Sequence, residues 1–146
     1  MTQAIANAHI YAARRARLAA QLGEGGVAII PTAPEHARNR DSDFPYRHDS
    51  YFYYLTGFNE PNAWLVLDAT GRSTLFCQPK DLEREIWDGY RLGPDAAVPA
   101  LGVTAAVSVA ELDKQLPKLL ENQHTVWYPF ATHKGLVTRV DGWLNA

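Results

Sequence analysis

The sequence predicts a layered α/β domain: a mixed sheet that begins with antiparallel strands and is flanked by helices on both faces. Apolar segments of strand length alternate with segments of helical periodicity along the chain, which is the pattern of such layered folds. Two expected strands, residues 50–56 and 63–68, are apolar on both sides, as happens when helices cover both faces of a sheet. The length of 146 residues fits a single domain, residues 1–146.

The first elements are a helix, a strand and a loop. Residues 8–22 predict a helix because apolar side chains recur on one side, and the glycines that follow end it. Residues 27–30 predict a short apolar strand that Pro31 closes. Residues 32–49 predict a long polar loop, and ordered loops of this length usually carry function.

A meander of three antiparallel strands is expected next, over residues 50–56, 63–68 and 73–78. The connections between them are short and contain turn residues, which favours antiparallel pairing of neighbours. The aromatic residues of the first of these strands are expected in the core: Phe52, Tyr53 and Tyr54.

Three helices and one strand are expected in the second half. Asp81 can cap a helix over residues 82–89. Residues 93–102, which contain glycine and proline, predict a loop. Residues 125–128 predict a strand and residues 135–144 a short last helix.

Another helix is expected between that loop and the last strand. Ser108 and Glu111 have the spacing of a capping box, so the helix should start just after Ser108. Pro117 lies inside its apolar pattern and is expected to kink or split it. Its buried face is formed by leucines: Leu112, Leu116, Leu119 and Leu120.

Composition excludes several classes of function. The net charge of −2 gives no field that would attract nucleic acid or an anionic membrane, and no apolar run is long enough to span a bilayer. Cys77 is the only cysteine, so no internal disulfide can form, and a cytoplasmic location is expected. The arginines near the start precede no apolar stretch, which argues against a secretory signal and leaves a transit peptide as the weaker alternative.

Generic catalytic motifs are absent from the sequence. Cys77 lies in an apolar strand, where a thiol is usually inert. Several acids and histidines of the polar loop could be drawn together as a metal site, but their spacing matches no zinc or calcium pattern, so a solvated loop is favoured. These residues are His36, Asp41, Asp43, His48 and Asp49.

A more specific signal lies in five sequence blocks: Arg40–Ser42, Phe44–Arg47, Phe52–Phe58, Glu60–Pro61 and Glu85–Gly93. Together with the arginine-bearing first helix, these blocks resemble the N-terminal domain of aminopeptidase P. The resemblance covers nearly the whole chain and implies a creatinase/aminopeptidase P N-terminal-domain fold, with a ribonuclease H-like layered architecture. Prolidases and creatinases share this fold, but their equivalent segments are less similar.

The resemblance implies part of a metal-dependent Xaa-Pro aminopeptidase, which removes an N-terminal residue that precedes proline. Members of the family carry a second, C-terminal domain of the pita-bread type that holds two metal ions, typically manganese, and this chain lacks it. This domain is therefore expected to bind no cofactor and to be inactive alone. Its expected partners are peptides with proline in second position, its own C-terminal domain and neighbouring subunits.

The resemblance also implies where substrate would be contacted. Asp41 matches an acid that the family places near the bound peptide, and Trp87 matches an aromatic that reaches into a neighbouring active site. Arg40, Tyr46 and Arg47 belong to the same expected substrate-groove wall. The alternatives are that Asp41 caps a turn, that Trp87 is part of the core, and that the arginines fix the loop.

Three other functions stay open at this point. The fold could serve as a free-standing module for dimerisation or peptide binding. The chain could be the N-terminal domain of a prolidase, which is an Xaa-Pro dipeptidase. A divergent hydrolase that uses the loop acids is the least favoured of the three.

Overall fold

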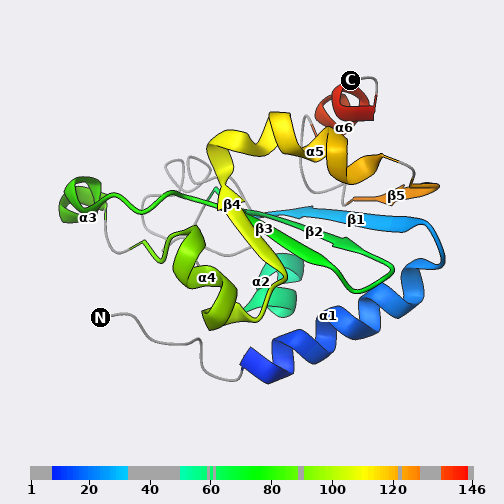
Figure 1. The fold of residues 1–146 in the computed structure, drawn as a ribbon, viewed down its shortest axis with the longest axis horizontal. Coiled ribbons are helices and arrows are strands. Elements are labelled where there is room, and N and C mark those ends of the chain that lie inside the picture. Colours follow the sequence, from blue (N-terminus) through cyan, green and yellow to red (C-terminus); the bar gives the residue numbers. More distant parts are fainter. Residues whose placement is uncertain are drawn as a thin grey trace.

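The computed structural model is a single sheet of five strands with helices packed on both faces (Figure 1). It describes residues 8–32, 50–58, 60, 62–88, 91–121, 123–128 and 136–144. The elements are α1 (Ala8–Leu22), β1 (Gly26–Pro31), α2 (Ser50–Thr56), β2 (Trp64–Asp68), β3 (Ser73–Cys77), α3 (Leu82–Asp88), α4 (Pro94–Leu101), β4 (Ala105–Ser108), the 3₁₀ turn η2 (Val109–Glu111), α5 (Leu112–Leu120), β5 (Thr125–Trp127) and α6 (Leu136–Leu144).

The sheet is mixed, with the strand order β4-β3-β2-β1-β5. Its centre is antiparallel, because β2 pairs in that sense with both β1 and β3. The two outer strands are parallel to their neighbours, β4 to β3 and β5 to β1. Trp64 pairs with Pro31 of β1 on one side and with Phe76 of β3 on the other, so the carboxyl ends of β1 and β3 lie at the same end of the sheet.

Strand alternation divides the core into two layers. Ala28 and Ile30 of β1 pack towards α1, α2 and α4, whereas Val27 and Ile29 pack towards α5 and α6. Figure 1 shows these two groups of helices on opposite sides of the sheet. The predicted fold class is therefore confirmed, and burial on both faces explains why the strands are apolar throughout.

The strand predicted over residues 50–56 is wrong, since this segment is the helix α2. Phe52, Leu55 and Thr56 are buried, at a spacing of three and four residues, whereas Tyr53 and Tyr54 are 38% and 51% exposed. Of the three aromatic residues expected in the core, only Phe52 is there. A continuous apolar run has no visible period, so helix and strand could not be told apart from it.

The loop predicted over residues 93–102 is also wrong, because α4 fills most of it. Pro94 begins the helix, where its missing N–H costs nothing, and Gly102 ends it with φ of 73°. The proline and glycine are thus the two ends of a short helix, and Ala97, Ala100 and Leu101 form its buried side.

The remaining elements follow the predictions closely. The predicted helix over residues 8–22 is α1, and a helix does begin after Ser108, whose Oγ accepts a hydrogen bond from the N–H of Ala110 at 3.2 Å. The 3₁₀ turn η2 leads into α5, which continues through Pro117 without splitting. Leu112, Leu116 and Leu120 of α5 are buried as predicted. Strand β4 had no counterpart among the expected elements.

Arg15 joins three helices on the α1 side of the sheet. It is only 4% exposed, and it donates hydrogen bonds to the carbonyl oxygens of Leu55 at 2.9 Å and Leu101 at 2.8 Å. These carbonyls lie in the last turns of α2 and α4, where no helical N–H is available to them. The preceding Arg14 donates to the carbonyl of Tyr54, and its guanidinium lies 4.2 Å from the centre of that ring.

Asp113 connects the two helices on the other face. Its Oδ1 accepts hydrogen bonds from the indole N–H of Trp143 at 2.9 Å and from Arg139 at 3.0 Å, both on α6. These bonds, first that of Trp143, hold the pKa of the Asp113 carboxyl below its ordinary value. Within the described ranges, every helix is too short or too polar to cross a lipid bilayer.

Candidate functional site

Helix α3 stands away from the sheet and its covering helices (Figure 1). The chain leaves the sheet after Cys77, forms α3 and returns to the body at Leu92. Three large apolar side chains of α3 are exposed: Leu82 by 73%, Ile86 by 76% and Trp87 by 84%. At about 3.6 residues per turn, Leu82 and Ile86 lie roughly 40° apart around the helix and Trp87 roughly 100° further round, so α3 presents one broad apolar face to its surroundings.

This exposure decides one of the alternatives left open by the sequence. Trp87 is not part of the core, since a core residue would be almost fully covered. Large apolar side chains gathered on a projecting element are typical of an interaction surface. The exposed face of α3 (Leu82, Ile86 and Trp87) is therefore the leading candidate for a functional surface among the described residues.

The other predicted substrate-groove residues lie outside the described residues: Arg40, Asp41, Tyr46 and Arg47. The structure does describe the residues on either side of this segment, Thr32 before it and Ser50 after it. Thr32 follows β1 and forms two hydrogen bonds with Ala63, from its N–H to the Ala63 carbonyl at 2.9 Å and from the Ala63 N–H to its Oγ1 at 3.2 Å. Thr32 therefore lies at the same end of the sheet from which the chain departs towards α3.

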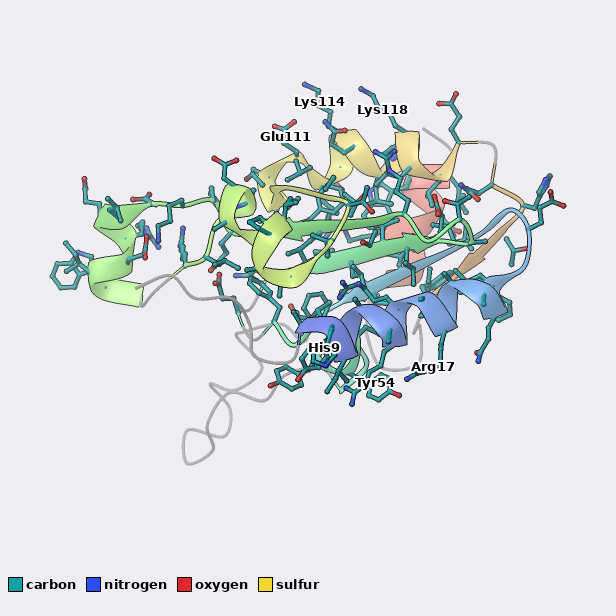
Figure 2. All side chains as sticks on the ribbon, turned by 60° about the horizontal axis from the view of Figure 1, so that its bottom comes forward. His9, Arg17, Tyr54, Glu111, Lys114 and Lys118 are labelled. Carbon is teal, nitrogen blue, oxygen red and sulfur yellow. The ribbon has the colours of Figure 1, made fainter. Side chains whose placement is uncertain are left out.

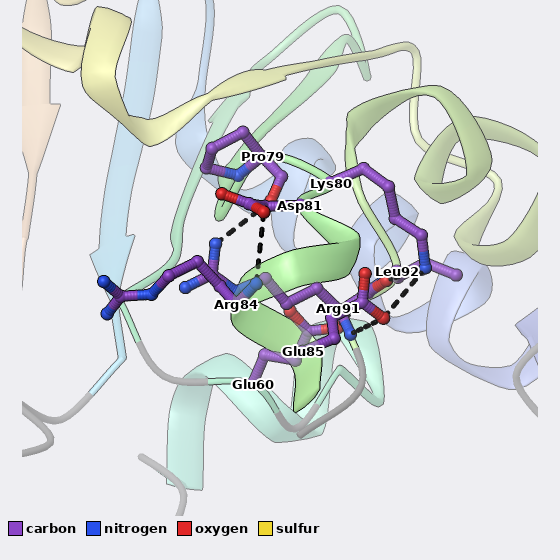
Figure 3. Close-up of polar contacts among 8 residues, drawn as sticks. All are labelled: Glu60, Pro79, Lys80, Asp81, Arg84, Glu85, Arg91 and Leu92. Carbon is purple, nitrogen blue, oxygen red and sulfur yellow. Dashed lines mark hydrogen bonds and ion pairs between the residues drawn. The ribbon is translucent and has the colours of Figure 1, made fainter. Parts of the chain in front are cut away.

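Two short segments connect α3 to the body, and we call residues 78–81 and 91–93 the neck (Figure 3). The Nζ of Lys80 donates to the carbonyl of Arg91 at 2.7 Å, and the Arg91 guanidinium donates to the carbonyl of Pro79 at 3.3 Å. These bonds link the outgoing segment of the neck to the returning one.

Two carboxylates form further hydrogen bonds with the neck. One oxygen of Glu85, on α3, accepts hydrogen bonds at 3.1 Å from both Lys80 Nζ and the Arg91 N–H. Glu60 Oε2 accepts one at 2.7 Å from the N–H of Leu92. Leu92 itself is buried in the core layer of α1, α2 and α4. Glu60 thus connects the returning segment of the neck to the body of the domain.

The two carboxylates differ in their electrostatics. Burial raises the pKa of Glu60, and the nearby Glu85 carboxylate raises it further, against the opposing effects of the Leu92 N–H, Arg91 and Lys80. The pKa of Glu85 is lowered, first by the N–H of Arg91 and then by Lys80. The sequence did not single out this cluster, although Glu60 and Glu85 both fall in the blocks that carry the family resemblance.

The described residues offer little that would support catalysis. Burial, with a contribution from Glu60, raises the pKa of Cys77 to about 12, so its thiol is protonated and unreactive at neutral pH. No group of three or more histidine, cysteine or acidic side chains that could hold a metal is found in the part of the chain that the structure describes. This part therefore supplies no ligand set for a pair of metal ions.

A hollow of about 410 Å³ lies beside α1 and the β1–β5 edge of the sheet. Its lining is mainly apolar: Leu18, Gln21, Leu22, Ala28, Ile30, Leu55, Trp127 and Tyr128. Among these lining residues Tyr128 carries the single titratable group.

Comparison with known proteins gives one consistent result. The family described as aminopeptidase P, N-terminal domain, matches residues 11–127. The Xaa-Pro aminopeptidase of Escherichia coli is 46% identical over 119 residues, and that of Haemophilus influenzae 40% over 118 residues. Each alignment covers 79% of this chain but 27% of the relative, so the chain spans about a quarter of the length of these proteins.

Solved structures agree with the sequence comparisons. Pseudomonas aeruginosa aminopeptidase PepP superposes with a TM-score of 0.87 at 39% identity, covering 98% of this chain and 33% of that one. Escherichia coli aminopeptidase P with the inhibitor Pro-Leu gives 0.84 at 41% identity, covering 93% and 32%. The chain belongs to the aminopeptidase P N-terminal domain family.

Proposed function

We propose that this chain is the N-terminal part of a metal-dependent Xaa-Pro aminopeptidase, which removes the N-terminal residue of peptides that have proline in second position. Support comes from the relatives, which are Xaa-Pro aminopeptidases and extend well beyond the matched part. Because these relatives are aminopeptidases, they also favour this activity over that of a prolidase.

Within that enzyme, the domain supports assembly and walls the substrate groove rather than performing the chemistry. The observation that carries this role is the exposed apolar face of α3, above all Trp87 at 84% exposure. An indole stacks well on a proline ring or an aliphatic side chain and loses little entropy on binding, so it suits a groove shared between two copies. Neighbouring subunits and the enzyme's own C-terminal domain are the proposed partners.

The polar loop completes the proposed wall. The carboxylate of Asp41 would pair with the protonated α-amine of a short peptide through a charge-assisted hydrogen bond. Arg40, Tyr46 and Arg47 would border the same groove. The placement of Thr32 supports this arrangement, because this residue, the last described one before these positions, lies at the end of the sheet from which α3 also departs.

The metal centre belongs to the C-terminal domain in this proposal, as the family resemblance implies. Two divalent ions, manganese by family resemblance, would provide the polarised carbonyl and the hydroxide for hydrolysis there. A cytoplasmic location is also proposed, and the single cysteine is compatible with a reducing compartment.

The test compares the 146-residue chain with the full-length protein, each incubated with manganese and a peptide that has proline in second position. The full-length protein should release the first residue, whereas this chain alone should release none. A peptide with alanine in place of proline is the control for specificity. Release of amino acid by the isolated chain would overturn the non-catalytic role.

The free-standing interaction module remains the second candidate, because the exposed face of α3 would serve self-association equally well. Kinetics of Trp87→Ala in the full-length protein distinguish the two. A groove wall predicts a fall in kcat/KM on the order of tenfold with little change in melting temperature. A fall in oligomer stability with unchanged kcat/KM per active site would favour the module instead.

A further inference from the structure

Helix α3 has no apolar attachment to the rest of the described structure. None of its described side chains belongs to either core layer, and its own apolar residues are exposed. A helix of seven residues gains too little from its own hydrogen bonds to be stable alone. The direction in which α3 presents Trp87 must therefore be set by the neck.

The neck is built to hold a defined shape. Its two segments approach so closely that a Cβ on Gly93, which has φ of 82°, would lie 2.9 Å from the Cβ of Lys80. Lys80 bridges these segments through the Arg91 carbonyl. Since a hydrogen bond is directional, the contact between Lys80 and the Arg91 carbonyl fixes direction as well as distance.

Glu85 joins the helix itself to both segments of the neck. A single oxygen accepts from Lys80 on the outgoing segment and from the Arg91 N–H on the returning one (Figure 3). Its side chain is 11% exposed, although it lies on a projecting helix. Glu85 and Trp87 are two residues apart, so they point to different sides of α3, and the carboxylate contacts the neck on the side away from Trp87. Asp81 of the neck also bonds the helix, since its Oδ1 accepts a hydrogen bond from the N–H of Arg84 at 3.1 Å.

Glu60 supplies the connection to the body. In the chain it lies between two buried residues, Phe58 and Ala63, which are 2% and 0% exposed. Its carboxylate accepts the N–H of Leu92, a residue whose side chain is itself buried in the core. A chain of contacts thus runs from the core through Glu60 and the neck to Glu85 on α3.

We infer that Glu60 and Glu85 are positioning residues, which hold α3 so that Trp87 projects in the direction needed to reach the substrate groove of a neighbouring copy. This inference rests on the proposed function of Trp87. Neither carboxylate contacts substrate in this scheme, and both act through the orientation of α3.

The first experiment tests the neck in the full-length protein without reference to activity. Hydrogen exchange is measured on the peptide spanning residues 79–93 for Glu60→Ala, Glu85→Ala and the control Glu83→Ala, an exposed acid of the same helix. Loss of a charge-assisted acceptor should speed exchange in this peptide on the order of tenfold for the first two variants. Unchanged exchange in both, or an equal change in the control, would overturn the inference.

The second experiment is a double-mutant cycle on kcat/KM with Glu85→Ala and Trp87→Ala. If Glu85 acts through Trp87, the double variant is no worse than Trp87→Ala alone, because the second change has nothing left to orient. Glu85→Gln, which keeps an oxygen acceptor for the Arg91 N–H, should recover most of the activity. Losses that multiply, or a fall in melting temperature with unchanged kcat/KM, would overturn the positioning role.

The two experiments also separate the inference from the proposed function. If Trp87→Ala has normal kcat/KM, the proposed groove wall fails, and the part of the inference that concerns the substrate groove fails with it. If the kcat/KM of Trp87→Ala is impaired but that of Glu85→Ala is not, only the inference fails.

Discussion

Replacing Arg15 with alanine should destabilise the domain strongly, because this buried side chain caps two helices at once. The change removes hydrogen bonds to the carbonyls of Leu55 and Leu101. Hydrogen bonds from a charged donor contribute roughly 1.5–3 kcal/mol each, so the gross loss is about 3–6 kcal/mol. Burial also lowers the pKa of Arg15, which shows that its charge is held at a desolvation cost that the variant avoids.

The net loss expected is therefore about 3 kcal/mol, a large share of the roughly 5–15 kcal/mol by which domains are stable. With a urea m-value of about 2 kcal/mol/M, the unfolding midpoint should fall by roughly 1.5 M. Arg15→Lys keeps the charge but reaches a single carbonyl at best, so it should lose about half as much.

The matched control is Arg17→Ala on the same helix, where the side chain is exposed and projects outward (Figure 2). Such a surface change should stay within about 0.5 kcal/mol of the unaltered protein. If Arg15→Ala unfolds within about 1 kcal/mol of the unaltered chain, or no differently from Arg17→Ala, the account of Arg15 as a helix cap is refuted.

Two further predictions concern other parts of the domain. Asp113→Ala should lower the free energy of unfolding by up to about 1 kcal/mol at pH 7, since Asp113 is mostly exposed. The bond from Trp143 depresses the pKa of Asp113 in the folded protein. The difference in urea midpoint should therefore be present above the ordinary aspartate pKa of about 3.9 and vanish as pH falls through the folded value. A difference that grows towards acid pH would contradict this. Cys77 should react with a thiol reagent at pH 8 only after unfolding, since its pKa is about 12 in the buried strand; rapid labelling of the folded protein would show that the thiol is accessible.

Much of the fold could be predicted from the sequence because local chemistry agrees with the final structure in most elements. Glycines end α1, a capping serine precedes η2, and buried apolar runs mark β1, β2 and β3. Periodicity fails where packing decides between two equally apolar conformations, as in α2, where Phe52 and Leu55 are buried but Tyr53 is not. Proline and glycine misled the prediction for α4, since they mark the ends of that helix as readily as a loop.

The candidate site was predictable only as far as the family resemblance reached. Trp87 was picked out by its sequence block, but its exposure depends on the departure of α3 from the sheet, which no local pattern reveals. The neck is still less visible from sequence, because Glu60 and Leu92 are 32 positions apart and meet only in the folded chain. The loop residue Asp41 stays a prediction, since it lies outside the described residues.

Photo-crosslinking from position 87 of the full-length protein tests the central claim most directly. With Trp87 replaced by a benzophenone amino acid, illumination should join one copy to another and give a covalent dimer, whereas the same replacement at Glu83 should give much less. Equal yields from both positions, or crosslinks from position 87 only within its own chain, would contradict the assignment of α3 as the element that reaches a neighbouring subunit.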